Sequence, residues 1–186
     1  MKIKVLTSLI VTVAFLAVGC HTEPTPDKPD NPAPTDGVVF TANYFDCEYY
    51  GDYYTPNIGN YYIHLSDSGF TESGYARPNS TYYRLDLYSD LYDDAEGGAL
   101  RLPVGTYTLD TEDTLAHGTF SVAWSKYLRS NADGEFSEEL SFEAGELRVT
   151  ESGAQLKVTI AGTEHVCLPR LGIRYDEVVQ SISPCR

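Results

Sequence analysis

Residues 146–160 read ELRVTESGAQLKVTI, and this stretch decides the fold class. Apolar and polar residues alternate over 147–150 and again over 156–160, which is the period-two pattern of a half-buried β-strand. Glu151-Ser152-Gly153 separates the two runs closely enough for a β-hairpin. The stretch therefore predicts two antiparallel strands joined by a short turn.

The same alternation recurs over residues 61–66, 83–88 and 120–125, with turn residues between the runs. In the last run Phe120, Val122 and Trp124 share a face, so we expect that face, with Trp124, to be buried. No segment shows a sustained helical period. These features predict an all-β domain, a single antiparallel sandwich or barrel of about seven to eight strands.

The first 37 residues predict export and a tether. A charged start and an apolar run over 5–18 form a secretory signal at residues 1–19. The boundary Leu16-Ala17-Val18-Gly19-Cys20 resembles the lipobox of bacterial lipoproteins, which implies that Cys20 carries lipid and anchors the chain to a membrane. An ordinary signal peptide with an incidental cysteine is the alternative. Residues 20–37 are proline-rich and lack apolar surface, which predicts a disordered tether.

We place the all-β domain at residues 38–166 and an irregular C-terminal tail at residues 167–186. The alternation fades after His165, and the chain from Cys167 reads CLPRLGIRYDEVVQSISPCR. Pro169 interrupts the strand that the preceding turn would start. Such a tail would leave one strand edge uncovered.

The charge of the chain excludes one class of partner. The sequence has 27 acidic residues against 13 lysines and arginines, a formal net charge of −14. Loss of residues 1–19, which hold two of the lysines, would bring the net charge to −16. Such a chain repels phosphate backbones and has no basic patch with interleaved aromatic residues, so we expect no nucleic-acid partner.

Several strand and turn motifs resemble those of one family. YYGDYY at 49–54, NYYIHLSD at 60–67, YRLDLY at 83–88, LPVGTYTL at 102–109 and the hairpin at 146–165 are similar to motifs of Bacteroidota surface lipoproteins, most of them uncharacterised. The resemblance implies an all-β fold and a lipid-anchored position at the outer membrane, at the cell surface or on the periplasmic face. It implies no catalytic residue and no cofactor.

Tyrosine is abundant, with 15 residues in the chain, and many stand in adjacent pairs. A pair splits across the two faces of a strand, so one ring packs in the core and the other points outward. Tyr61 and Tyr83 share faces with aliphatic residues, which predicts that Tyr62, Tyr82 and Tyr88 are exposed. Outward tyrosines are rigid amphipathic contacts for a ligand, although a mainly structural cluster is the alternative. The predicted ligand contacts are Tyr49, Tyr50, Tyr53, Tyr54, Tyr62, Tyr82 and Tyr88.

Cysteines and one short motif are candidates for covalent modification. Cys47, Cys167 and Cys185 allow one disulfide or remain free thiols, and no C-x-x-C spacing predicts a zinc site. Asp113-Thr114-Leu115 matches the short pattern used for O-glycosylation in Bacteroidota, which makes Thr114 the candidate acceptor.

Metal and catalytic motifs are few. The acidic loop with Asp90, Asp93, Asp94 and Glu96 is a candidate for calcium, as is the loop 131–135, and an ordinary turn is the alternative for both. No nucleophile motif occurs, and the histidines lack a metal-ligand spacing.

These features favour a lipid-anchored, non-enzymatic binding module for a glycan or a protein at the cell surface. A structural or adhesive component of a surface assembly, which pairs through its uncovered strand edge, is the alternative. An enzyme with an unrecognised carboxylate site is the third hypothesis.

Overall fold

A computed structural model describes residues 37–92, 101–169 and 180–181, and within these ranges the chain is all-β, as predicted. None of the described segments forms a helix that is long and apolar enough to span a membrane. The predicted signal peptide, Cys20, the tether and most of the C-terminal tail lie outside the described residues.

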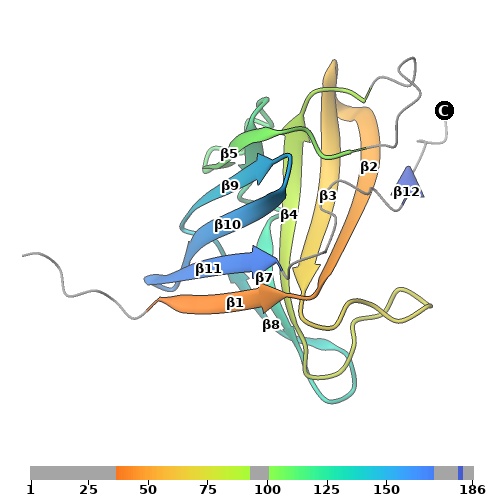
Figure 1. Cartoon of the computed structure of the whole chain (residues 1–186), viewed down its shortest axis with the longest axis vertical. Coiled ribbons are helices and arrows are strands. Elements are labelled where there is room, and N and C mark those ends of the chain that lie inside the picture. The colour runs from red at the N-terminus through yellow and green to blue at the C-terminus, as the bar shows by residue number, and fades with distance from the viewer. Residues whose placement is uncertain (1–36, 93–100, 170–179, 182–186) are drawn as a thin grey trace, which may run out of the picture. The chain divides into compact units, whose positions relative to one another are not determined.

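The described part of the chain contains twelve strands. Figure 1 shows how they are arranged, with most of them labelled. Their bounds are β1 Val38–Ala42, β2 Tyr44–Thr55, β3 Ile58–Ser66, β4 Thr81–Ser89, β5 Gly105–Asp110, β6 Thr119–Ser121, β7 Lys126–Ser130, β8 Phe136–Ser141, β9 Ala144–Thr150, β10 Gly153–Ile160, β11 Thr163–Pro169 and β12 Gln180–Ser181.

These strands form one mixed sheet in the order β1-β11-β10-β9-β5-β6-β4-β3-β2-β12, with β7 and β8 paired beside β4. The predicted count of seven to eight strands is therefore too low, and the sheet is not purely antiparallel. The pairs β1–β11, β5–β6 and β2–β12 are parallel. Alternation along one strand carries no information about the direction of a distant partner, which is why these pairs were not predicted.

The hairpin predicted from residues 146–160 is confirmed as β9 and β10. Thr150 pairs with Gly153 across the turn, and Leu147 pairs with Leu156 farther along the ladder. Both leucines are buried, so the apolar members of the alternation face the core, as the pattern indicates.

The sheet curls so that β2, β3 and β4 pack against β9, β10 and β11 around one apolar core (Figure 1). Tyr61 and Tyr83 lie in this core, each 1% exposed, beside aliphatic side chains such as Leu85 and Leu156. The inward assignment of Tyr61 and Tyr83 is therefore confirmed.

The single strand expected over residues 120–125 is wrong. β6 ends at Ser121, a turn follows, and β7 begins at Lys126. The Ser125 amide donates to the Ser121 carbonyl, and the Trp124 amide donates to Ser121 Oγ, so a turn interrupts the strand here. β6 and β7 both pair antiparallel with β4, so the chain resumes the same direction after the turn. Phe120 is buried, whereas Trp124 is 61% exposed, because the turn takes it off the face that Phe120 occupies. The expected burial of Trp124 is therefore wrong.

The C-terminal part of the domain is more regular than expected. β11 continues through Cys167 and Leu168 to Pro169, three residues past the predicted end of the domain. β1 pairs in parallel with β11 over this whole length, from Val38 opposite His165 to Ala42 opposite Pro169. The edge of β11 is thus covered by β1, and β1 is the first strand in the order of the sheet.

Candidate functional site

Strands β3 and β4 present two different faces. Tyr61 and Leu87 point into the main core, while the alternate residues Tyr62, Asp86 and Tyr88 lie on the opposite, outer face. Period-two parity therefore assigned the faces correctly. A candidate functional site lies on this outer face.

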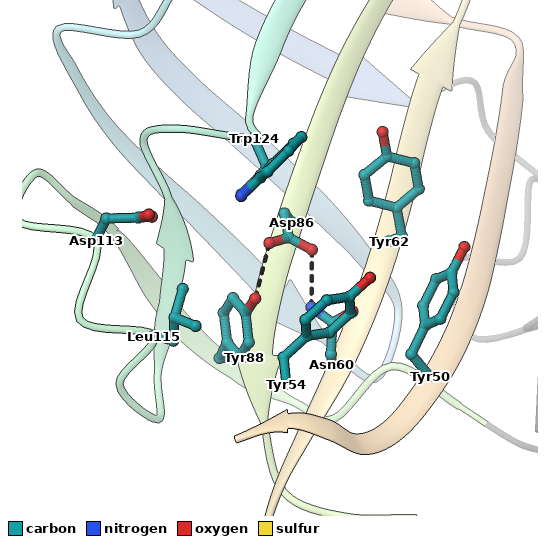
Figure 2. A pocket seen from close by; sticks show the side chains of 9 residues that line it. All are labelled: Tyr50, Tyr54, Asn60, Tyr62, Asp86, Tyr88, Asp113, Leu115 and Trp124. Carbon is teal, nitrogen blue, oxygen red and sulfur yellow. Dashed lines mark hydrogen bonds between the residues drawn. The ribbon is translucent and has the colours of Figure 1, made fainter. Parts of the chain in front are cut away.

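Loops and strand ends cover part of the outer face and enclose a pocket of about 450 Å³. Its size falls within the range of about 300–1,000 Å³ that is typical of small-ligand sites. The lining residues are Tyr50, Tyr54, Asn60, Tyr62, Asp86, Tyr88, Asp113, Leu115 and Trp124. Figure 2 shows Asp86 at the centre of this set, with Asp113 and Leu115 on one side and Tyr50 and Tyr62 on the other.

Asp86 forms the floor of the pocket and is only 6% exposed. Its Oδ1 accepts a hydrogen bond from Asn60 Nδ2 at 2.8 Å, and its Oδ2 accepts one from the Tyr88 hydroxyl at 2.9 Å (Figure 2). Its backbone amide donates to Ser125 Oγ at 3.0 Å. These contacts fix the carboxyl group in one orientation beneath the aromatic rings.

The charge of Asp86 is poorly compensated. Burial raises the pKa of its carboxyl group, and the nearby Asp113 raises it further, against the hydrogen bonds from Asn60 and Tyr88 and the charge of Arg84. Asn60 is also buried, and its Oδ1 has no hydrogen-bond partner among the described residues. The floor therefore contains an acceptor, Asn60 Oδ1, that receives no hydrogen bond from a described residue and could accept one from a ligand.

Four tyrosines and a tryptophan line the pocket. The Tyr50 ring lies edge-on to Tyr54 and Tyr62, with centroids 6.1 and 6.4 Å apart. The Tyr50 hydroxyl donates to Glu48 Oε2 at 2.7 Å, which fixes its tip. Trp124 and Tyr54 are both more than half exposed, so the rings at the entrance remain accessible to a ligand.

A β-bulge in β2 positions two of these tyrosines. The pairing of β2 with β3 shifts register between Tyr49 and Gly51, and again between Gly51 and Thr55. Gly51 has φ 62°, a left-handed conformation that a residue with a side chain adopts at a cost. Bulges bend a strand and re-aim its side chains, and this one lies between Tyr50 and Tyr54.

The loop between β5 and β6 supplies the opposite wall. Asp113 and Leu115 both have positive φ, 56° and 58°, which is unusual for residues other than glycine. Asp110 holds the loop, since its Oδ2 accepts hydrogen bonds from the Thr114 amide and hydroxyl, each at 2.6 Å. Ser121 Oγ donates to Asp113 Oδ1, which ties this wall to the end of β6.

The structure brings four of the seven predicted tyrosine contacts into the pocket, Tyr50, Tyr54, Tyr62 and Tyr88. The other three lie elsewhere. Tyr49 is buried in the main core against Tyr61, with centroids 4.8 Å apart. Tyr53 is exposed next to Tyr54 but does not line the pocket, and Tyr82 packs in a separate small cluster.

The expected exposure of Tyr82 and Tyr88 is wrong, since they are 0% and 2% exposed. Both lie on the predicted outer face, but other segments cover that face. Tyr82 packs with Ala76, Leu128 and Phe70 in a second apolar cluster, and its hydroxyl donates to the carbonyl of Gly69. Tyr88 closes the floor of the pocket. Tyr62, also expected to be exposed, is half-buried in the pocket wall.

Sequence reasoning did not single out Asp86, Asp113, Leu115 or Trp124 as site residues. The sequence offered one sign of Asp86, which is its place among the outward residues of the tyrosine-bearing stretch 83–88. The pocket lining also includes three loop residues, Asp113, Leu115 and Trp124. Alternation along a strand does not show which strand a neighbouring loop packs against.

The other candidate sites are only partly described. Asp90 is exposed and its Oδ1 lies 3.0 Å from Nε2 of His117, while Asp93, Asp94 and Glu96 lie outside the described residues. No group of three or more acidic, histidine or cysteine side chains suited to a metal occurs within the described ranges.

The loop 131–135 forms the turn between β7 and β8. Asn131 Oδ1 accepts hydrogen bonds from the amides of Asp133 and Glu135, at 2.9 and 3.0 Å. This oxygen is therefore used by the turn itself, as in the ordinary-turn alternative.

Two of the three cysteines considered for a disulfide, and Thr114, lie within the described residues. Cys47 and Cys167 are buried free thiols, and burial raises the pKa of both. They are not bonded to each other, and Cys185 lies outside the described residues. Thr114 is exposed at the pocket rim, between the two lining residues Asp113 and Leu115.

Comparison of the chain with protein-family models, with curated proteins and with solved structures gives no match.

Proposed function

We propose that the chain is a lipid-anchored extracytoplasmic module whose outer-face pocket binds one sugar residue of a glycan. The observation that carries the proposal is the pocket's composition, five aromatic rings around the hydrogen-bonded carboxyl group of Asp86. A sugar has apolar C–H faces that stack on rings and hydroxyl edges that donate to carboxylates and amides. The pocket supplies both kinds of partner within one enclosure.

The N-terminal sequence supports the location in this proposal. A lipidated Cys20 followed by a proline-rich segment would hold the domain away from a bilayer, where extracellular or periplasmic glycans are within reach. The resemblance to Bacteroidota surface lipoproteins supports the same location.

We also propose that the domain is best classed as an open half-barrel rather than a sandwich. The two layers that enclose the main core belong to one hydrogen-bonded sheet, whose path runs from β1 to β12 without a break. In a sandwich the layers would be separate sheets.

A hydrolase is the second candidate function, because two carboxylates, Asp86 and Asp113, line the pocket and burial raises the pKa of Asp86. Glycoside hydrolysis commonly uses such a pair. Both oxygens of Asp86 already accept hydrogen bonds from the protein, which favours binding over proton transfer. Release of reducing ends from a bound glycan would show hydrolysis.

A glycan array tests the proposed function. The full-length chain, in a detergent without a sugar head group, is compared with Trp124→Ala and with Tyr75→Ala. Tyr75 is 73% exposed and does not line the pocket, so Tyr75→Ala is the control for nonspecific binding of glycans to an exposed aromatic ring. We expect the wild type and Tyr75→Ala to bind the same glycans and Trp124→Ala to lose them. Binding to no glycan, or equal binding by all three chains, would contradict the proposal.

A further inference from the structure

We propose that the sugar bound in this pocket carries a free, protonated amino group, which lies against Asp86. The inference rests on the proposed function and adds the chemical class of the ligand to it. It follows from three properties of the pocket: its charge, the bonding of its floor and its ring of aromatic side chains.

The described part of the lining is acidic. Asp86 and Asp113 both line the pocket, whereas no lysine, arginine or histidine among the described residues does. Arg84 is a basic neighbour, with its Cζ 5.9 Å from the centroid of the Tyr62 ring, and its Nε donates to the Trp124 carbonyl. An acidic sugar would therefore meet two carboxylates without a cation in the lining to offset them, which disfavours it.

Asp86 lacks a counter-charge of its own. Its oxygens accept hydrogen bonds from two neutral groups, the Asn60 amide and the Tyr88 hydroxyl, and it forms no ion pair with a described residue. A buried carboxylate without a paired cation is costly, and an ammonium group of the ligand would provide that cation. The unpartnered Oδ1 of Asn60 offers a further acceptor beside it. A protonated amine has three donors and no acceptor, which fits such a floor.

The aromatic rings favour the same ligand. A cation is attracted to the face of a tyrosine or tryptophan ring, and the attraction grows where water is excluded. Tyr50, Tyr54, Tyr62, Tyr88 and Trp124 surround the space above Asp86. A neutral N-acetyl group lacks the positive charge that the ring faces and the two carboxylates attract, so the pocket should favour an amine over its acetylated form.

Isothermal titration at pH 6 with a matched pair of oligosaccharides tests this inference. The chitosan tetramer carries free amines, and the chitin tetramer has the same backbone with acetylated amines. We expect full-length wild-type chain to bind the chitosan tetramer about tenfold more tightly or better. Asp86→Asn should reduce this preference to about twofold or less, and Asp113→Asn should weaken chitosan binding at least about threefold, because asparagine also tolerates the left-handed backbone at this position.

Asp133→Asn is the matched control, since the whole chain is acidic and attracts cations generally. Asp133 lies in the exposed turn between β7 and β8, outside the pocket, so its loss should leave the preference unchanged. An Asp133→Asn chain that loses the preference as Asp86→Asn does would overturn the inference. If Asp86→Asn does not fold, an unchanged chitosan affinity in Asp113→Asn would overturn it.

The failures of the two proposals are distinguishable. Equal or tighter binding of the chitin tetramer would overturn the amino-group inference and leave the glycan-binding function standing. Binding of neither tetramer, with no glycan bound on the array, would overturn both. A response to choline without a response to any sugar would also overturn both and would identify a different ammonium ligand.

Discussion

At the scale of single residues, Asp86 is a buried acidic group that costs the domain stability. Asp86 is 6% exposed and forms no ion pair with a described residue. An uncharged side chain of the same shape would therefore stabilise the fold at least as well. Functional sites commonly retain such groups at a cost to stability. The cost gives a prediction that separates a ligand-binding role from a structural one.

Asp86→Asn should raise the melting temperature at pH 7. Burial raises the folded-state pKa of Asp86 above its unfolded value, so its ionised form costs stability at neutral pH. This cost is absent below the unfolded pKa of about 4 and appears as the pH rises through the folded pKa. The advantage of the variant should therefore shrink as the pH falls from 7 toward 4. Thermal melts at both pH values check this, and a variant less stable than wild type at pH 7 would contradict it.

His64 should make the domain sensitive to acid. It packs between the rings of Tyr62 and Phe70, and burial together with the charge of Arg84 lowers its pKa to about 4. The unfolded chain takes up a proton near pH 6.5 and the folded chain does not, so stability is full above 6.5 and falls as the pH drops toward 4.

His64→Phe should remove this loss. The ring contacts remain, and the drop in unfolding free energy between pH 7 and pH 5 should become smaller by up to about 2 kcal/mol. Urea unfolding at the two pH values measures it. A drop as large in the variant as in the wild type would show that His64 titrates normally.

At the scale of elements, the β2 bulge links backbone geometry to the pocket. Gly51 and Gly74 both have positive φ, 62° and 79°, and a Cβ at either would meet no atom within 4 Å. Alanine at either position should therefore cost about 1–2 kcal/mol through backbone strain alone.

Only Gly51→Ala should also impair the pocket. The bulge aims Tyr50 and Tyr54, so relief of the strain by backbone adjustment would move both rings, while Gly74 lies in the loop before β4 and outside the lining. We expect both variants to lose similar stability and Gly51→Ala alone to bind ligand several-fold more weakly. Equal affinities in the two variants would show that the bulge does not position the site.

The elements also show how far the sequence could be read. Period-two alternation located the central strands and the faces of the tyrosines in β3 and β4, because successive side chains of a regular strand point to opposite faces. It did not assign the tyrosines of residues 49–54, where a bulge shifts the register of β2. It did not give exposure on the outer face. Tyr82 is covered by Phe70 and Leu128, which belong to other segments, and alternation within one strand contains no information about such neighbours.

The site was predictable in part for the same reason. Tyr50, Tyr54, Tyr62 and Tyr88 come from strands, and the density of tyrosine in those strands was visible. Trp124 lies in a turn whose residues alternate between apolar and polar as those of a strand do. The prediction therefore placed Trp124 in the core, which is wrong. Its neighbours in the sequence, Ser121 and Ser125, close this turn through hydrogen bonds that no periodicity reveals.

At the scale of the whole molecule, a binding pocket is useful to the cell only if the chain is held where its ligand occurs. The fold class followed from the sequence, but the strand order did not. β1 and β11 are the first and last strands of the domain in sequence up to Pro169, yet they pair with each other. Nothing in the alternation pattern predicts a pairing between segments so far apart in sequence. The anchor is the part of the account that depends on sequence alone.

Cys20→Ala should abolish lipidation. The lipobox-like boundary at residues 16–20 predicts that a labelled fatty acid enters the wild-type chain and not the variant. Equal label in the two chains would contradict the anchor.

The central claim, that the outer-face pocket is the ligand site, can be measured through Trp124. It is the single tryptophan of the chain, it lines the pocket, and it is 61% exposed. Its fluorescence in the free protein should therefore resemble that of a tryptophan in water. Titration with the glycan selected on the array should shift the emission to shorter wavelength and saturate at the calorimetric Kd. Calorimetric binding that leaves Trp124 emission unchanged would place the ligand elsewhere and contradict the account.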